Sequence, residues 1–180
     1  MKIWQLRVEV DKYDNLIPVI PFSVEEIKSF DGRKHMENWK PIKVKRMEPE
    51  KHLELSDSPG FVITVFSKFA LECLLPLIKD YVEVLKLDFE EGEYFAINVI
   101  KVIDAIDYEK SKYTKFRDGK RILAFDKYVF IPEKVSEIPI FKISDEKHRW
   151  PFVSDELKRI IEANNLTGFN FKLVWDSEEK

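Results

Sequence analysis

The segment FVSDELKRIIEANNLTGFNFKLVW, residues 152–175, constrains the fold most strongly, because it specifies a helix, the end of that helix and a strand in succession. Ser154 is a favourable N-cap residue, and Asp155 places negative charge on the first helical turn, where the helix dipole favours it. Apolar residues then recur at spacings of i, i+3 and i+4 and predict a core-facing stripe of Leu157, Ile160 and Ile161. The segment therefore begins with an amphipathic helix that packs on a larger body.

The same segment also predicts how the helix ends. Asn164 and Asn165 supply a residue that tolerates the left-handed conformation of a helix C-terminus, and Gly168 turns the chain. Apolar residues then alternate with other residues at Phe169, Phe171, Leu173 and Trp175. This period of two predicts a terminal strand with one buried face. We expect that face, including Trp175, to pack against the helix stripe.

Strand-like segments outnumber helical ones along the rest of the chain. Apolar runs and alternations, rich in β-branched and aromatic residues, predict strands within 4–10, 39–47, 61–66, 82–87, 94–104 and 139–143. Asp118 and Gly119 predict the tight turn of a hairpin within residues 112–130. A sheet built from such segments would contain several short connections.

Two further helices are predicted. Residues 23–32 contain a capping box that begins at Ser23 and a glycine where a helix would stop. A second helix is expected from residue 68 to about residue 75, with Ser67 as its N-cap. Pro76 should end or kink this helix, because proline lacks the backbone N–H that a helix interior requires.

These elements together predict an α+β fold, in which a mixed or mainly antiparallel sheet has a few helices packed on it. A chain of 180 residues suits one domain over residues 1–180, or two small lobes that share a core. The acidic stretch at residues 88–93 is the candidate seam between two such lobes.

Charge and cysteine content argue against several classes of function. Thirty basic and thirty-three acidic residues give a net charge of −3, which provides no general attraction to nucleic acid or to an anionic membrane. Cys73 is the single cysteine, which suits a reducing compartment. The first ten residues do not resemble a signal peptide, and no apolar run has the length of a membrane span. We expect a cytoplasmic protein without nucleic-acid or membrane partners.

Candidate catalytic and metal-binding residues are few. None of the histidines, which are His35, His52 and His148, has a second His or Cys at metal-ligand spacing. Asp104 and Asp107 could form an acid–base pair, but residues i and i+3 of a strand point to opposite faces, so the pair converges only where the backbone turns. The alternative is that Asp107 ends the strand by capping a turn. We expect no cofactor and no metal, and a cleft near Asp104 and Asp107 is the candidate site of an enzyme or small-ligand binder.

Two charged segments are candidate partner surfaces. Residues 110–121, KSKYTKFRDGKR, interleave basic side chains with two aromatic rings, which suits single-stranded nucleic acid or the exposed face of a hairpin. Lys115 and Arg117 are the candidate contacts of this segment with an acidic partner. The acidic turn offers the opposite charge to a basic partner through Glu90, Glu91 and Glu93.

An ordered series of motifs extends over most of the chain. It comprises FDG at 30–32, WKPIKV at 39–44, SDSP at 56–59, VFSKFALECLLPLI at 65–78, YFAINVIKVIDAID at 94–107, IFKI at 140–143, FVSDEL at 152–157 and GFNFKLVW at 168–175. Their order and spacing resemble the Imm11 immunity proteins of bacterial polymorphic toxin systems. The chain departs from that pattern at Asp80 and Tyr81, where the family tends to have an Asn/Gly turn.

The resemblance implies a protein that binds and neutralises a cognate toxin in competition between bacteria, and that is not an enzyme. It implies no catalytic residues. The motif residues are expected to shape turns, helix caps and buried aromatic contacts, and they include Trp39, Pro41, Asp104, Asp107, Ser154, Asp155, Gly168, Phe169 and Trp175. The toxin-binding surface is expected at variable positions, to which a family pattern does not point.

Overall fold

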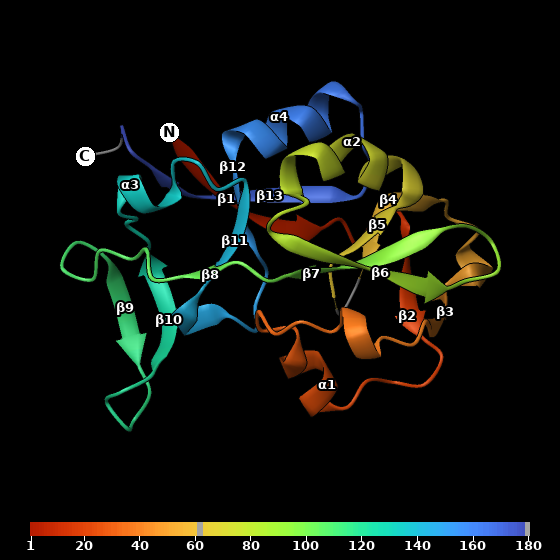
Figure 1. Ribbon diagram of the computed structural model, residues 1–180, viewed down its shortest axis with the longest axis horizontal. Helices are drawn as coiled ribbons and strands as arrows, with labels where there is room; N and C mark the ends of the chain where they lie inside the picture. Colours follow the sequence, from red (N-terminus) through yellow and green to blue (C-terminus); the bar gives the residue numbers. More distant parts are fainter. Residues whose placement is uncertain (61–62, 179–180) are drawn as a thin grey trace.

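The computed structural model describes residues 1–60 and 63–178, whose strands form two main sheets and a separate hairpin (Figure 1). The five-stranded sheet has the order β13–β1–β12–β11–β8, with β1 (Lys2–Val8), β8 (Val102–Ile103), β11 (Ile140–Ile143), β12 (Phe152–Ser154) and β13 (Phe169–Asp176). The six-stranded sheet has the order β4–β2–β3–β6–β7–β5, with β2 (Asp14–Pro18), β3 (Ile42–Arg46), β4 (Leu55–Gly60), β5 (Val65–Ser67), β6 (Val82–Asp88) and β7 (Tyr94–Val99). The hairpin consists of β9 (Lys112–Lys115) and β10 (Ile122–Lys127).

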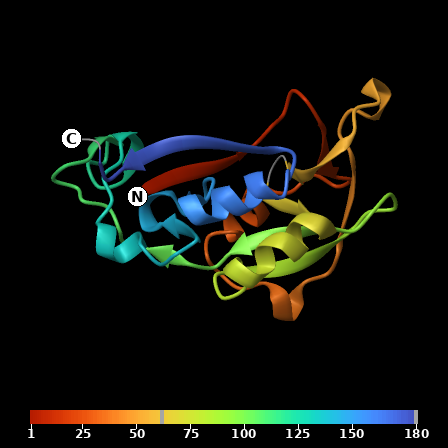
Figure 2. The ribbon, with the colours of Figure 1, turned by 90° about the horizontal axis from the view of Figure 1, so that it is seen from above.

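Both sheets are mixed and mainly antiparallel, and the parallel pairs are β2–β4, β3–β6 and β8–β11. The α-helices are short and comprise α1 (Val24–Ser29), α2 (Lys68–Ile78), α3 (Pro132–Val135) and α4 (Asp155–Ala163). Single 3-10 turns occupy Met36–Asn38, Pro49–Lys51 and Ser144–Glu146. Two views show α2 and α4 side by side on one side of the molecule (Figures 1 and 2). This arrangement confirms the predicted α+β class.

One hydrophobic core joins the two sheets beneath α2 and α4. Its buried residues come from both helices and both sheets, and include Leu6, Phe66, Leu74, Ile97, Val153 and Leu157. Leu157 and Ile161 are buried and Ile160 packs against them, so the predicted helix stripe is confirmed. A second cluster of buried residues lies around Phe130 and includes Ile3, Phe141 and Phe152. Burial of this apolar surface is the main force that holds the sheets together.

The termini of α4 form as the sequence predicts. The Ser154 hydroxyl accepts a hydrogen bond from the Leu157 backbone N–H at 3.3 Å, and Asn165 has a left-handed φ of 53°. Gly168 follows with a φ of 80°, and a Cβ at this position would collide with the side chain of Ser56. Glycine is therefore required here both by its conformation and by the close approach of β4.

The predicted packing of Trp175 is wrong. Along β13, Leu173 pairs with Trp4 but Trp175 pairs with Ile3, so Val174 is an extra residue in the ladder. This bulge shifts the alternation by one residue and turns Trp175 to the opposite face. There its ring lies 5.8 Å from that of Phe130, in the second cluster, and not against the α4 stripe.

The prediction that Phe169, Phe171 and Leu173 form one buried face of β13 is correct only in part. The Phe169 ring lies 5.3 Å from that of Phe66, and Phe169 and Phe171 both pack against the first core. Leu173, next to the bulge, is 36% exposed. The predicted single buried face is therefore present in the first half of the strand and is lost where the bulge begins.

Helix α2 is longer than predicted. The Ser67 hydroxyl caps its start by accepting from the Ala70 N–H at 3.0 Å, as expected, but Pro76 lies inside the helix, which continues to Ile78. Burial of the apolar face, which reaches Ile78, offsets the missing hydrogen bond at proline. The predicted strand over 61–66 appears as β5, which starts at Val65, while residues 61–62 lie outside the described part of the chain.

The stretch at 88–93 is not a seam between the sheets. It contains the turn that connects β6 and β7, which pair along their length within the six-stranded sheet. The chain crosses to the five-stranded sheet at Ile100 and Lys101, so the predicted long strand over 94–104 is divided into β7 and β8. The Lys101 carbonyl accepts from the Lys142 N–H at 2.8 Å and thereby connects the crossing to β11.

The segment before β3 is held by Trp39. Its indole N–H donates to the Lys86 carbonyl of β6 at 2.8 Å, and its ring meets that of Phe30 edge-on at 6.3 Å. Pro41 directly precedes β3, as the sequence predicts for a residue that cannot donate to a ladder. Both residues therefore shape the fold.

Candidate functional site

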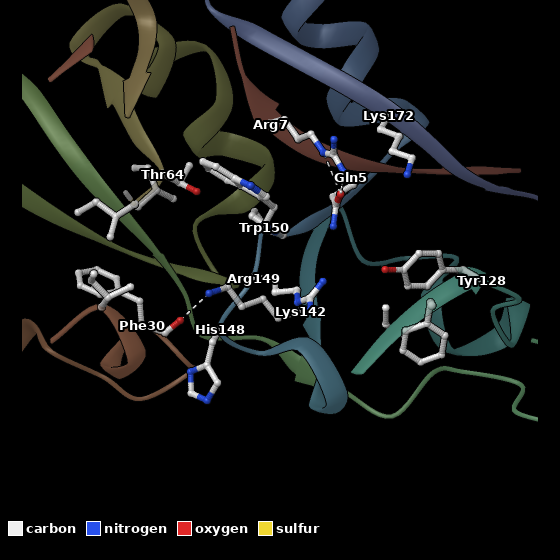
Figure 3. Close-up of a pocket in the computed structure, with 16 residues that line it drawn as sticks. Gln5, Arg7, Phe30, Thr64, Tyr128, Lys142, His148, Arg149, Trp150 and Lys172 are labelled. Carbon is white, nitrogen blue, oxygen red and sulfur yellow. Dashed lines mark hydrogen bonds between the residues drawn. The ribbon is translucent and has the colours of Figure 1, made fainter. Parts of the chain in front are cut away.

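A cleft of about 470 Å³ lies where the two sheets, the end of α1 and the β9–β10 hairpin meet (Figure 3). Its polar and aromatic lining includes Gln5 and Arg7 from β1, Lys142 from β11, Trp150 before β12, and Phe125 and Tyr128 at the end of the hairpin. Four of the lining residues carry a Lys or Arg side chain, and none of the described lining residues is acidic. The cleft is therefore an electropositive, aromatic-lined cavity.

Lys142 is the most unusual residue of the cleft, because it is 7% exposed. Its ammonium group donates to the Phe30 carbonyl at 2.5 Å, a contact that connects β11 to the end of α1. Burial lowers the pKa of Lys142 to about 8, and the negative charge of Asp31 opposes that shift. A lysine in this environment is still mainly protonated at neutral pH.

Gln5 and Arg7 form a fixed pair on the opposite side of the cleft. The Gln5 side-chain carbonyl accepts from Arg7 Nε at 3.0 Å and from Arg7 Nη2 at 2.7 Å. Gln5 is 5% exposed, so this neutral contact orients the guanidinium from a rigid strand. Because Gln5 is neutral, it does not compensate the positive charge of Arg7.

Tyr128 and Arg149, which both line the cleft near the hairpin, contact the same carboxylate, that of Glu146. The buried Glu146 carboxylate accepts from the Tyr128 hydroxyl at 2.7 Å and pairs with Arg149 at 3.3 Å. Burial, reinforced by the bond to Glu146, raises the pKa of Tyr128, so the phenol stays neutral and remains a donor. Glu146 therefore offsets the charge of Arg149 but not that of Arg7 or Lys142.

The acidic turn is engaged by its own chain. Each predicted contact residue pairs with a cation, namely Glu90 with Lys43 at 3.1 Å, Glu91 with Arg46 at 2.7 Å and Glu93 with Lys68 at 2.7 Å. The hydrogen bond from Lys68 lowers the pKa of Glu93. These exposed pairs contribute little stability, but they reduce the negative potential that a basic partner would meet.

The basic hairpin forms as predicted (Figure 1). Lys115 at the end of β9 and Arg117 in the turn that follows are both exposed. Gly119 has a left-handed φ of 66°, and the Phe116 N–H donates to the Arg121 carbonyl at 2.9 Å across the turn. Phe116 is 40% exposed beneath the Arg121 guanidinium, which lies 4.8 Å from its ring centre. The tip therefore combines accessible positive charge with an accessible apolar ring.

Asp104 and Asp107 do not form an acid–base pair in the cleft, which neither residue lines. Asp107 accepts from the Lys110 N–H at 3.2 Å and pairs with the Lys110 ammonium at 2.7 Å. Asp104 is exposed, and its backbone carbonyl accepts from Lys134. Asp107 thus has the turn-capping role that was the alternative to proton chemistry.

His35, His148 and Cys73 have structural contacts, and His52 has a left-handed φ of 53° at the end of a 3-10 turn. A ring nitrogen of His35 lies 3.0 Å from the Ser29 carbonyl, and one of His148 lies 2.9 Å from the Lys28 carbonyl. Cys73 packs half-buried against the first core. Within residues 1–60 and 63–178, no group of three or more His, Cys, Asp or Glu side chains could hold a metal ion. No helix in this part of the chain is both long and apolar enough to cross a bilayer.

The model of an immunity protein family, Imm11, matches residues 81–176, which is more than half of the chain. The chain belongs to the Imm11 family. Among curated proteins, none matches this Imm11 chain. The resemblance seen in the sequence is thereby confirmed, although the motifs at 30–78 lie outside the Imm11 match. The match includes the hairpin, Lys142 and Trp150, whereas Gln5 and Arg7 precede it.

The sequence reasoning missed the cleft of this Imm11 protein. Gln5 and Arg7 alternate with apolar residues in β1, which is the period of a half-buried strand, but their face is covered by the hairpin and by residues near α1. Lys142 gave the clearest signal, since it is a lone charge within the apolar strand PIFKI. A charged residue at the centre of a short apolar strand is a departure from the pattern of a buried strand.

Proposed function

We propose that this Imm11 protein protects the cytoplasm of a bacterium by binding the cognate toxin of a polymorphic toxin system in a stoichiometric complex. Membership in an immunity protein family carries this proposal. Neutralisation by binding requires a complementary surface and no catalytic group. The separation of Asp104 and Asp107 from the cleft is in keeping with such a role.

The β9–β10 hairpin is the surface that we assign to the toxin contact. Residues 110–121 contain six basic residues and one acidic residue, and Lys115 and Arg117 are exposed. Phe116 and Leu123 expose 40% and 42% of their surface on the same hairpin. Aromatic and Arg side chains are the residues that most often dominate binding energy at protein interfaces. The partner surface is therefore expected to be acidic around an apolar pocket.

The acidic turn is the second candidate, for a basic toxin. Its three carboxylates would have to exchange their pairs with Lys43, Arg46 and Lys68 for pairs with the toxin. That exchange reduces the net gain in binding free energy. Lys115 and Arg117 are accessible to a partner without any such exchange. The hairpin is accordingly the better supported of the two surfaces.

Co-expression with the toxin gene next to the gene for this protein tests both the function and the surface. Cells should survive with the wild-type chain and should be killed when Lys115 and Arg117 are both replaced by Glu. A variant with Glu90 and Glu93 replaced by Lys should still protect. If only the acidic-turn variant fails to protect, the acidic turn is the contact and the hairpin assignment is wrong. If the folded wild-type protein protects against no neighbouring toxin, the immunity proposal fails.

A further inference from the structure

The buried Lys142 is not explained by the stability of the fold. Its ammonium group can donate three hydrogen bonds, and the Phe30 carbonyl takes one of them. Among residues 1–60 and 63–178, no carboxylate lies within ion-pair distance of Lys142. Nearby Asp31 pairs instead with Arg33 at 2.9 Å and with Lys147 at 3.4 Å. Burial of an unpaired charge opposes folding. A bound anion would satisfy this lysine.

Further donors face the same space. Figure 3 shows the Gln5 amide nitrogen pointing into the cleft, while its carbonyl oxygen holds Arg7. Gln5 and Arg7 lie on one side of the cleft and Lys142 on another, and Lys172 projects beside Arg7. An Arg fork combined with a Lys point charge is a common arrangement for binding phosphate groups. The donors are preorganised, since Gln5 and Lys142 are both more than nine-tenths buried.

Flat aromatic surfaces flank these donors. The Tyr128 ring stacks on Phe125 with centroids 4.8 Å apart, and the bond to Glu146 holds Tyr128 in place. The indole of Trp150 lies across the cleft from Tyr128 (Figure 3). Aromatic side chains in this position offer stacking surfaces to a planar ring. The cleft therefore presents both an anion site and a site for a flat apolar group.

We propose that this cleft binds a small phosphate ester that carries a flat ring, of about the size of a mononucleotide. The phosphate is bound between Arg7, Gln5 and Lys142, and the ring lies against Trp150 and Tyr128. The cavity of about 470 Å³ is within the usual range for small-molecule sites, roughly 300–1,000 Å³. This site is separate from the exposed tip of the hairpin, so the proposal does not depend on toxin binding.

Isothermal titration calorimetry with the purified chain tests this site. The probes are AMP, GMP, CMP and UMP, each measured separately, with the matching nucleoside and inorganic phosphate as partial ligands. At least one nucleotide should bind, and it should bind more tightly than either partial ligand. Lys142→Met should weaken that binding by at least about tenfold, as expected for loss of a charged hydrogen bond. Lys134→Met is the matched control, because Lys134 also donates to a carbonyl, that of Asp104, but lies outside the cleft.

Melting curves establish first that each variant is folded. If Lys142→Met does not fold, Arg7→Met at the edge of the cleft replaces it, with the same expected loss. The proposal is overturned if none of the four nucleotides binds. It is also overturned if the matching nucleoside binds as tightly as the nucleotide that binds, or if the folded cleft variant binds like the wild type.

Discussion

Asp155 accepts a hydrogen bond from the indole N–H of Trp4 at 2.8 Å, and its other carboxylate oxygen accepts from the Lys2 backbone N–H at 2.9 Å. One residue on the first turn of α4 thus holds two groups of β1, near the other end of the chain. The Ser154 cap and the favourable charge at the helix N-terminus depend on the same turn. Asp155 therefore joins helix initiation to strand placement.

The variant Asp155→Ala should lose both hydrogen bonds and destabilise the protein by about 2–3 kcal/mol, because the two donors of β1 lose a charged partner. Urea unfolding followed by circular dichroism measures this change. Glu156→Ala is the control, since Glu156 is exposed on the same turn and its removal also deletes one negative charge. Equal losses in the two variants would mean that charge at the helix terminus is responsible and that the contacts with β1 contribute nothing.

Gly168→Ala should be more harmful than Gly119→Ala, although both residues have positive φ angles. A methyl group at residue 168 meets Ser56, whereas a Cβ at residue 119 has no atom within 4 Å. The hairpin variant should therefore show backbone strain alone, about 1 kcal/mol, and the Gly168 variant should lose more than that. Thermal melts of the two variants give the comparison, and equal melting temperatures would contradict the close approach of β4 to Gly168.

Lys142 should make stability depend on pH. Its pKa of about 8 in the folded protein is below the ordinary value of 10.5, so the unfolded chain binds more protons between these values. The stability of the wild type should therefore rise through this window, by about 3 kcal/mol relative to a variant that lacks the group. Unfolding free energies of wild type and Lys142→Met at pH 7 and pH 10 measure the change. The variant should be the more stable protein at pH 7, and this advantage should shrink at pH 10.

A control variant separates this effect from general changes with pH. Lys134→Met, at an exposed site, is the control for general effects of replacing a lysine with methionine. If the difference between Lys142→Met and wild type is constant, burial does not lower the pKa of Lys142 in the folded protein, and this prediction is wrong.

Charge reversal on the hairpin should act on the rate of toxin association. Steered complexes associate at up to about 10⁸–10⁹ M⁻¹s⁻¹ at low salt, and replacing Lys115 and Arg117 with Glu should slow association by at least about tenfold. The melting temperature should hardly change, since exposed charges contribute about 0–1 kcal/mol. Stopped-flow measurements at two salt concentrations show whether the effect is electrostatic. Strand β3 lies at the other end of the molecule from the hairpin in Figure 1. Replacing the exposed Lys40, just before β3, and Lys45, within it, with Glu gives the same change of net charge and should leave the rate nearly unaltered.

Local features of this fold could be predicted because they depend on neighbouring residues. The Ser154 cap, the left-handed Asn165 and the turn at Gly119 each follow from a few adjacent side chains. The bulge at Val174 could not be predicted, because it arises from pairing with β1 and shifts the face of Trp175. Helix α2 passes through Pro76 because tertiary burial outweighs a local preference.

The cleft could not be predicted for a related reason. It brings together residues that are far apart in the sequence, such as Gln5 and Lys142. Whether each of them lines the cleft depends on which face of its strand is covered by other elements. The charge of the acidic turn was visible in the sequence, but its pairing with cations from β3 and α2 was not. The family resemblance supplied the functional class, whereas the contact surface that we propose rests on the exposure of the hairpin.

The most direct test of the immunity proposal is a titration of toxin activity with the purified protein. A candidate toxin encoded next to this gene is held at a fixed concentration well above the expected dissociation constant, and its residual activity is measured as the protein is added. Stoichiometric binding predicts a linear decrease that ends at an equimolar ratio, together with a complex of that composition in size-exclusion chromatography. Activity that persists in a folded excess of the protein would contradict the proposal, and complete inhibition by a small fraction of an equivalent would show that the protein acts as a catalyst.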